Sequence, residues 1–218
     1  MSIFTFMAAG ACLLLCPAGP ALLAAEAATD GGTHPAVAVF MDFDSKPGDA
    51  SVKVMKHEAE ALLKASGVAL NWQMLDPSHG TNPAAGLVVV RFRGRCRVEA
   101  WPQPGEDEAP VGTHTLGFTH ISNGHVLPSS EIECDQIRKA LQYLAPDSTP
   151  SERQRAFGLA MGRVVAHELY HILARTTSHA EEGLARATQS LRDLVTAPSM
   201  DFGPRDSQAM GQAFTAKR

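Results

Sequence analysis

The segment His167-Glu168-Leu169-Tyr170-His171 combines the residue types of a metal site and of a general base. Four residues advance an α-helix by about 400°, so His167 and His171 would lie one turn apart on the same face. Both imidazoles could then reach one Zn²⁺ ion at about 2.0–2.1 Å. Glu168 lies beside the first ligand and could take a proton from a water molecule whose pKa zinc lowers to about 7. The segment therefore predicts a zinc-dependent hydrolase, most often a peptidase.

Apolar residues surround the motif at helical spacing, as a buried active-site helix requires. They are Val164, Val165, Leu169, Ile172 and Leu173. The alternative interpretation is a core helix whose two histidines only form hydrogen bonds.

A catalytic zinc site needs a third protein ligand and an open fourth position. His179 is the first candidate, because it follows the motif after a short stretch of poor helix formers, Thr176-Thr177-Ser178. Such residues favour turns and helix ends, so we expect the helix to end near Arg175 and the chain to fold back. His179 would then approach the metal from a short loop.

The motif resembles the metzincin class of zincin metallopeptidases, in which HExxH is followed by a glycine turn and a third histidine. Here His179 comes two residues later than in the HExxHxxGxxH pattern, and Ala174-Arg175 stands where the glycine is expected. The motif, the short turn and the pairs Ser178-His179 and Gly183-Leu184 also resemble a group of uncharacterised secreted bacterial proteins. This resemblance extends over about residues 88–214. The resemblance implies a zincin-like fold, a Zn²⁺ cofactor and a peptide or protein substrate.

Carboxylates are the alternative third ligands. Asp193 and Asp201 lie at a separation that resembles the aspzincin pattern, whereas Glu181 and Glu182 follow the helix too closely to resemble the thermolysin type. A site without a third protein ligand is the remaining alternative. A methionine turn beneath the metal is not evident, since methionine more often only packs in the core. Its candidates are Met200 and Met210.

Length and charge limit the classes of partner. The chain has 218 residues and is 44% hydrophobic, enough for one sizeable core but not for two full domains. A formal net charge of −4 and a pI near 6.1 give no reason to expect nucleic acid or an anionic membrane surface.

The first residues of the chain resemble an export signal. Ile3–Ala25 is nearly all apolar, and Ala25-Glu26-Ala27 supplies an A-x-A cleavage site. We expect a signal peptide over residues 1–27 and one zincin-like domain over residues 28–218, secreted or periplasmic and without stable membrane insertion after cleavage. No Lys or Arg precedes the apolar run, and a membrane anchor is the alternative because the run is long enough to span a bilayer.

Cysteine usage also fits export. Cys12 and Cys16 would leave with the signal, or mark a lipoprotein as the alternative. The remaining pair, Cys96 and Cys134, predicts a disulfide, worth about 3–4 kcal/mol in the chain-entropy model. Two buried free thiols are the alternative to that disulfide.

Hydrophobic patterns predict an α+β fold: a small twisted mixed sheet packed on helices, with the motif on a central helix and a short helical C-terminal part. Strands are expected over 36–43, 68–72, 87–92, 115–121 and 126–127, helices over 49–66, 136–144 and from 151 through the motif, and a surface loop over 101–112. Asn123-Gly124 predicts a hairpin turn. Zincins commonly bind an extended peptide against an edge strand, so the resemblance makes Gly117–Ser122 the expected substrate edge.

The hairpin region contains three further histidines, His114, His120 and His125. They could form a second metal site, and the alternative is a solvated hairpin face. We therefore predict an exported zinc metallopeptidase with Glu168 as the catalytic base and His167, His171 and His179 as the metal ligands. A secreted zinc-binding or scaffold protein without turnover is the alternative function.

Overall fold

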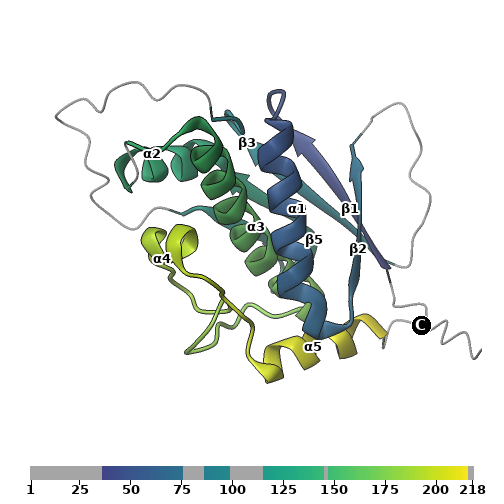
Figure 1. The fold of residues 1–218 in the computed structure, drawn as a ribbon. Helices are drawn as coiled ribbons and strands as arrows, with labels where there is room; N and C mark the ends of the chain where they lie inside the picture. The colour runs from purple at the N-terminus through teal and green to yellow at the C-terminus, as the bar shows by residue number, and fades with distance from the viewer. Residues whose placement is uncertain (1–35, 76–85, 99–114, 145–146, 216–218) are drawn as a thin grey trace, which may run out of the picture. The chain divides into compact units, whose positions relative to one another are not determined.

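A mixed five-stranded sheet carries the helices of this α+β protein (Figure 1). The computed structural model describes residues 36–75, 86–98, 115–144 and 147–215, all within the unit Thr33–Arg218. The strands are β1 (Ala36–Phe43), β2 (Ala69–Met74), β3 (Leu87–Arg93), β4 (Gly117–Ser122) and β5 (His125–Glu133). The coarse fold class predicted from the sequence is therefore confirmed. The expected signal peptide and the 101–112 loop lie outside the described residues.

The sheet has the strand order β2-β1-β3-β5-β4. Strands β2, β1, β3 and β5 run parallel, while β4 pairs antiparallel with β5 at the edge. Asn123 and Gly124 have φ angles of 51° and 76°, the positive values that a tight hairpin turn of type I′ requires. The predicted hairpin is confirmed, and β4 is an edge strand of the sheet, as expected.

One strand was predicted too short. Residues 126–127 and the segment before Cys134 belong to one continuous strand, β5, which pairs with β3 on one side and β4 on the other. Long-range pairing of Ser129–Glu133 with β3 makes this segment part of the strand, although Pro128 and Ser129 carry no strand pattern in the sequence. Local sequence could not reveal this pairing.

The helices are α1 (Asp49–Leu63), η1 (Lys64–Ser66), α2 (Cys134–Leu144), α3 (Pro150–Ala174), α4 (Leu191–Thr196) and α5 (Pro204–Thr215). The short η1 tightens the last turn of the predicted 49–66 helix, which stops at Gly67 with φ 71°. Helices α4 and α5 form the expected helical C-terminal part. No helix in the described ranges combines the length and apolarity that crossing a membrane demands.

Helix α3 is the central helix of the fold. Thr149 caps its start: Thr149 accepts a hydrogen bond from the Glu152 amide, and the Glu152 carboxylate accepts one from the Thr149 amide. Glycines allow α1 to pack closely against it. A Cβ at Gly158 would lie 2.6 Å from the carbonyl oxygen of Ser51, and one at Gly162 would lie 2.7 Å from that of Met55. This close packing holds the buried motif helix against α1.

Cys96 and Cys134 form the predicted disulfide, with Cα atoms 5.1 Å apart. Cys96 follows β3, and Cys134 is the first residue of α2. Both residues are fully buried in the hydrophobic core. The bridge therefore fastens the end of a central strand to the start of a helix.

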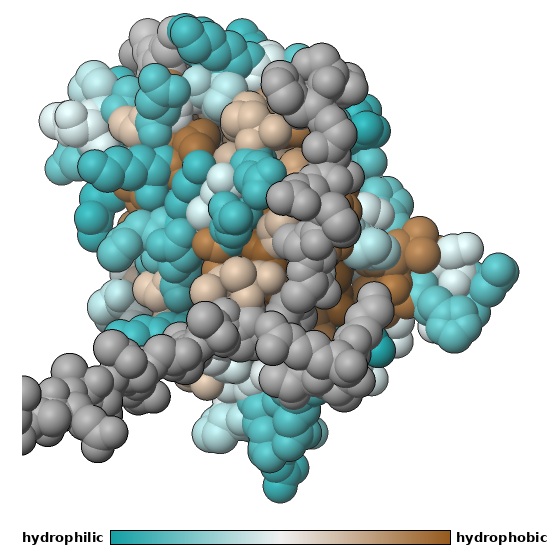
Figure 2. Space-filling view, turned by 90° about the vertical axis from the view of Figure 1, so that its right-hand side faces the viewer, coloured by the Kyte–Doolittle hydropathy of each residue, from teal (hydrophilic) through white to brown (hydrophobic). Residues whose placement is uncertain are grey.

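Exposed large apolar side chains are few in the described part of the chain. They are Met74, Phe118, Ile121 and Leu127. All but Met74 belong to the β4–β5 hairpin, so exposed apolar surface concentrates at that edge of the sheet. On the face shown in Figure 2, apolar residues lie near the centre of the view, and hydrophilic residues dominate its left side and its lower and right-hand margins.

Candidate metal centre

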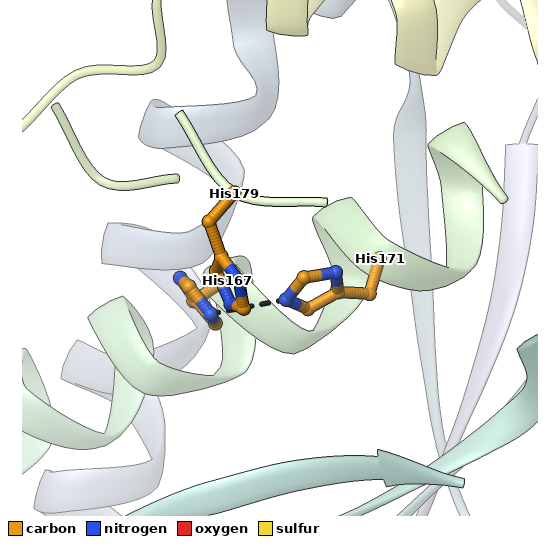
Figure 3. A group of neighbouring side chains, drawn as sticks. All are labelled: His167, His171 and His179. Carbon is orange, nitrogen blue, oxygen red and sulfur yellow. Dashed lines mark hydrogen bonds between the residues drawn. The ribbon is translucent and has the colours of Figure 1, made fainter. Parts of the chain in front are cut away.

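The three predicted metal ligands lie together (Figure 3). His167 and His171 project from α3 one turn apart, with ring centroids separated by 4.9 Å. His179 lies on the segment that follows the helix, with ring centroids 5.4 Å from His167 and 4.7 Å from His171. One ligand nitrogen from each residue lies within 4.8 Å of the others. The structure thus gathers all three histidines around one point.

Backbone carbonyls determine which nitrogen of the two helical histidines is free. Nδ1 of His167 lies 2.7 Å from the carbonyl oxygen of Leu184, and Nδ1 of His171 lies 2.8 Å from that of Thr176. A carbonyl only accepts, so each Nδ1 carries the proton and donates it. The lone pair of each ring is therefore on Nε2. Hydrogen bonds of this kind orient the imidazoles that hold metal ions in other proteins.

The two free nitrogens face each other. Nε2 of His167 and Nε2 of His171 are 3.2 Å apart. Burial, and the neighbouring histidines, lower the pKa of His167 to about 4 and lower the pKa of His171, so both rings are neutral at neutral pH. Two lone pairs at this distance repel unless a cation lies between them. Ligands about 2.05 Å from a tetrahedral zinc ion would be about 3.3 Å apart, so the observed separation fits such an ion.

The third candidate ligand, His179, lies in a segment whose other residues form hydrogen bonds to α3 and to one another. Arg175 ends the helix in the left-handed conformation, with φ 51°, which turns the chain back as predicted. The Tyr170 hydroxyl donates to the carbonyl oxygen of Ser178 at 3.3 Å, directly before His179. Gln189 donates to the carbonyl of Leu184, the same group that accepts from His167. The segment Thr176–Ser190, called the return segment below, is therefore tied to both helical ligands.

The alternative ligands lie elsewhere. Among the described residues, His167, His171 and His179 form the one group able to hold a metal ion, and Asp193 and Asp201 are not part of it. The hairpin histidines His120 and His125 form no such group either, and His114 lies outside the described residues. Met210 is fully buried in the core, consistent with simple packing.

Glu168 lies between the helix and the edge strand. Its side chain is buried, with 4% of its surface exposed. The hydroxyl of Thr119, on β4, donates to Oε2 of Glu168 at 2.7 Å. Burial raises the pKa of Glu168 to about 7, and the Thr119 bond opposes this rise. A carboxyl group with that pKa can both accept and donate a proton near neutral pH.

A cavity of about 450 Å³ reaches His167 and Glu168. Its walls come from the start of β4, from α3, from the return segment and from α4. The remaining lining residues are Thr115, Leu116, Gly117, Arg163, Val164, Leu184, Arg186, Ala187, Thr188, Gln189, Ser190 and Leu194. The candidate base and one candidate ligand therefore face a space that a substrate side chain could enter.

Arg163 builds the back of this cavity. It lies on α3 one turn before His167, is only 2% exposed, and bonds Glu58 of α1 at 2.7 Å. Its guanidinium also donates to three carbonyl groups in and directly after α4. Glu58 thus pairs with the positive charge of Arg163, and the bonds to the carbonyl groups hold α4 beside the motif helix. The position of Arg163 in the sequence, four residues before His167, did not predict these contacts with α4.

Two further functional contacts were missed from the sequence: the Thr119 hydroxyl and the Leu184 carbonyl. Thr119 belongs to the expected edge strand, but only the register of β4 against α3 brings it to Glu168. Every residue has a backbone carbonyl, so the sequence could not show that the carbonyl of Leu184 accepts a hydrogen bond from His167.

Comparison of the chain with protein families, curated proteins and solved structures finds no match. Its function is therefore inferred from the motif and the geometry of the site.

Proposed function

We propose that the protein is an exported zinc-dependent metallopeptidase with a zincin-like fold. One observation carries the proposal: nitrogens of three histidines lie close enough to hold one ion, and the buried Glu168, which follows His167 on the same helix, lines a cavity together with His167. His167, His171 and His179 would hold the ion, and three neutral imidazoles are a donor set that suits catalytic zinc. When bound, zinc would polarise the scissile carbonyl and lower the pKa of a coordinated water to about 7.

Glu168 moves the proton in the proposed reaction. Its carboxylate accepts a proton from the attacking water, whose oxygen bonds to the carbonyl carbon of the peptide. Glu168 then donates that proton to the amide nitrogen as the C–N bond breaks and the amine leaves. In the protein without bound metal, burial raises the pKa of Glu168 to about 7, so this carboxyl group can hold a proton near neutral pH.

The edge strand β4 offers main-chain groups to an extended peptide. The amide of Glu133 donates to the carbonyl of Leu116 at 2.8 Å, so Leu116 and Phe118 direct their main-chain groups toward β5. Alternation along an antiparallel pair then directs those of Gly117 and Thr119 away from β5. A substrate added to this edge would pass the cavity beside Glu168, and one of its side chains could occupy that cavity.

The disulfide supports export. Cys96 and Cys134 are paired, and structural disulfides persist in oxidising compartments outside the cytosol. The proposed signal peptide over residues 1–27 would deliver the chain to such a compartment.

Glu168→Gln tests the proposal. The variant should bind zinc with the same stoichiometry as the unaltered protein but cleave casein or a quenched peptide library at least about 100-fold more slowly, because the amide cannot accept a proton. Glu182→Gln is the matched control, since this exposed glutamate follows His179 and belongs to no described site. Cleavage by Glu168→Gln at the unaltered rate contradicts the assignment. An unaltered protein that binds zinc and cleaves nothing favours the zinc-binding protein without turnover.

A further inference from the structure

We propose that Thr119 is a positioning residue for Glu168: its hydroxyl holds one carboxylate oxygen so that the other is presented to the reacting groups. The inference rests on the proposed peptidase function and names a residue that the motif does not contain. Thr119 acts through Glu168 and is not itself a group that transfers a proton.

The contact is short and specific. Oγ1 of Thr119 lies 2.7 Å from Oε2 of Glu168 and 3.2 Å from the main-chain oxygen of the same residue. The hydroxyl has one proton, and the shorter distance assigns it to the carboxylate. A hydrogen bond to an ionised oxygen is about twice as strong as a neutral one, so this bond can restrain rotation of the carboxylate.

Gly117 leaves room for the other oxygen. It lies two residues before Thr119 on β4, on the same face of the strand, and lines the cavity. A Cβ at position 117 would lie 3.1 Å from Oε1 of Glu168 and 2.7 Å from a methyl group of Val164. One residue of the edge strand therefore holds Oε2, and another leaves the space beside Oε1 open. Oε1 is the oxygen that can accept and return the proton.

This arrangement joins the proposed peptide-binding edge to the base. Thr119 is a β4 residue whose main-chain groups face away from β5, while its side chain reaches α3. Loss of the hydroxyl should leave His167 and His171 in place, because their bonds run to Leu184 and Thr176 rather than to β4. The expected defect is therefore in turnover and not in metal binding.

Thr119→Val tests the role, because valine keeps the branched shape and lacks the hydroxyl. We expect kcat for a peptide substrate to fall about tenfold to 100-fold, as for loss of an outer partner in other metal sites, with KM and zinc affinity within about twofold of the unaltered protein. Thr119→Ser, which keeps the hydroxyl, should restore kcat to within about threefold. Thr119→Ala provides a second variant without the hydroxyl if the valine variant does not fold.

Ser130→Ala is the matched control. Ser130 lies opposite Thr119 on β5, is 1% exposed, and its hydroxyl has no hydrogen-bond partner among the described residues. Removal of this buried hydroxyl should leave kcat unchanged. An equal loss of kcat in Ser130→Ala and Thr119→Val would mean that any buried hydroxyl of the sheet matters, and would overturn the specific role of Thr119.

A second readout needs no activity. In the metal-free protein, a double-mutant cycle of Thr119→Val and Glu168→Ala should be non-additive in urea unfolding, by about fivefold in the unfolding constant, whereas Ser130→Ala and Glu168→Ala should be additive. Additive effects of Thr119 and Glu168, or an unchanged kcat in Thr119→Val while Glu168→Gln is inactive, overturn the inference and leave the proposed function standing. A zinc-loaded protein that cleaves no peptide overturns the proposed function, and the role of Thr119 with it.

Discussion

Helix α3 and the return segment contribute to the same candidate metal centre by different means. The helix supplies His167 and His171 through its regular period, and a capping box and close packing on α1 hold it in place. The return segment has almost no regular structure, and it supplies His179 together with the carbonyls that orient both helical rings. The helical repeat of α3 thus positions His167 and His171, whereas individual hydrogen bonds of the return segment position His179. The third ligand should therefore be the more easily displaced.

The largest expected effect is loss of a helical ligand. His167→Ala should lower zinc affinity about 100-fold to 1,000-fold, because it removes a ligand and leaves the Leu184 carbonyl without its histidine donor. His179→Ala should lower the affinity less, because this exposed side chain orients neither of the other rings. Competition with a chromophoric chelator measures both affinities. His57→Ala, at an exposed histidine of α1, is the control, and equal losses for His167 and His179 would contradict the comparison.

Displacement of the return segment tests the same contrast through the backbone. Gly183 has φ 71°, and a Cβ there would lie 2.5 Å from the carbonyl oxygen of Asp201. Gly183→Ala should lower the unfolding free energy by about 2–3 kcal/mol and weaken zinc binding, because the segment must shift away from Asp201 and carry with it the Leu184 carbonyl that accepts from His167. Thermal melting with and without zinc measures this effect.

Gly124→Ala is the matched control for Gly183→Ala. Gly124 has φ 76°, yet nothing lies within 4 Å of the position that its Cβ would take. It should cost only about 1 kcal/mol, from backbone strain, and leave zinc affinity unchanged. A Gly183→Ala variant that melts and binds zinc like Gly124→Ala would show that the return segment does not need its contact with Asp201.

The pH dependence of the metal-free protein separates the partly buried His167 from the buried Glu168. The pKa of His167 falls from 6.5 to about 4 on folding, so its unfolded form binds the extra proton, and stability is lost as pH falls from about 6.5 to 4. The pKa of Glu168 rises from 4.5 to about 7, so its folded form binds the extra proton, and stability is lost as pH rises from about 4.5 to 7. The two contributions oppose each other between these limits.

Removal of the glutamate charge should reveal the histidine contribution. In Glu168→Gln, the metal-free protein should gain stability more steeply from pH 4.5 to 7 than the unaltered protein, with a difference of up to about 3 kcal/mol at the upper limit. Urea unfolding at a series of pH values measures the slopes. Identical slopes would mean that Glu168 titrates normally in the folded state.

The part of the site that lies on one helix was predictable from sequence, and the part that depends on tertiary register was not. The spacing of His167 and His171 and the poor helix formers after Ala174 were enough to predict the shared face and the turn toward His179. The bond from Thr119 to Glu168 depends on how β4 is aligned with α3, which no local pattern records. The same limit explains why β5 was predicted too short, since pairing with β3 extends it.

X-ray absorption at the zinc edge of the loaded protein tests whether His167, His171 and His179 hold one ion. We expect one zinc per chain with three histidine nitrogens at about 2.0–2.1 Å and one oxygen ligand from water, and only two imidazoles with His179→Ala. A chain that binds no stoichiometric zinc, or a spectrum with three imidazoles that His179→Ala leaves unchanged, would contradict this expectation.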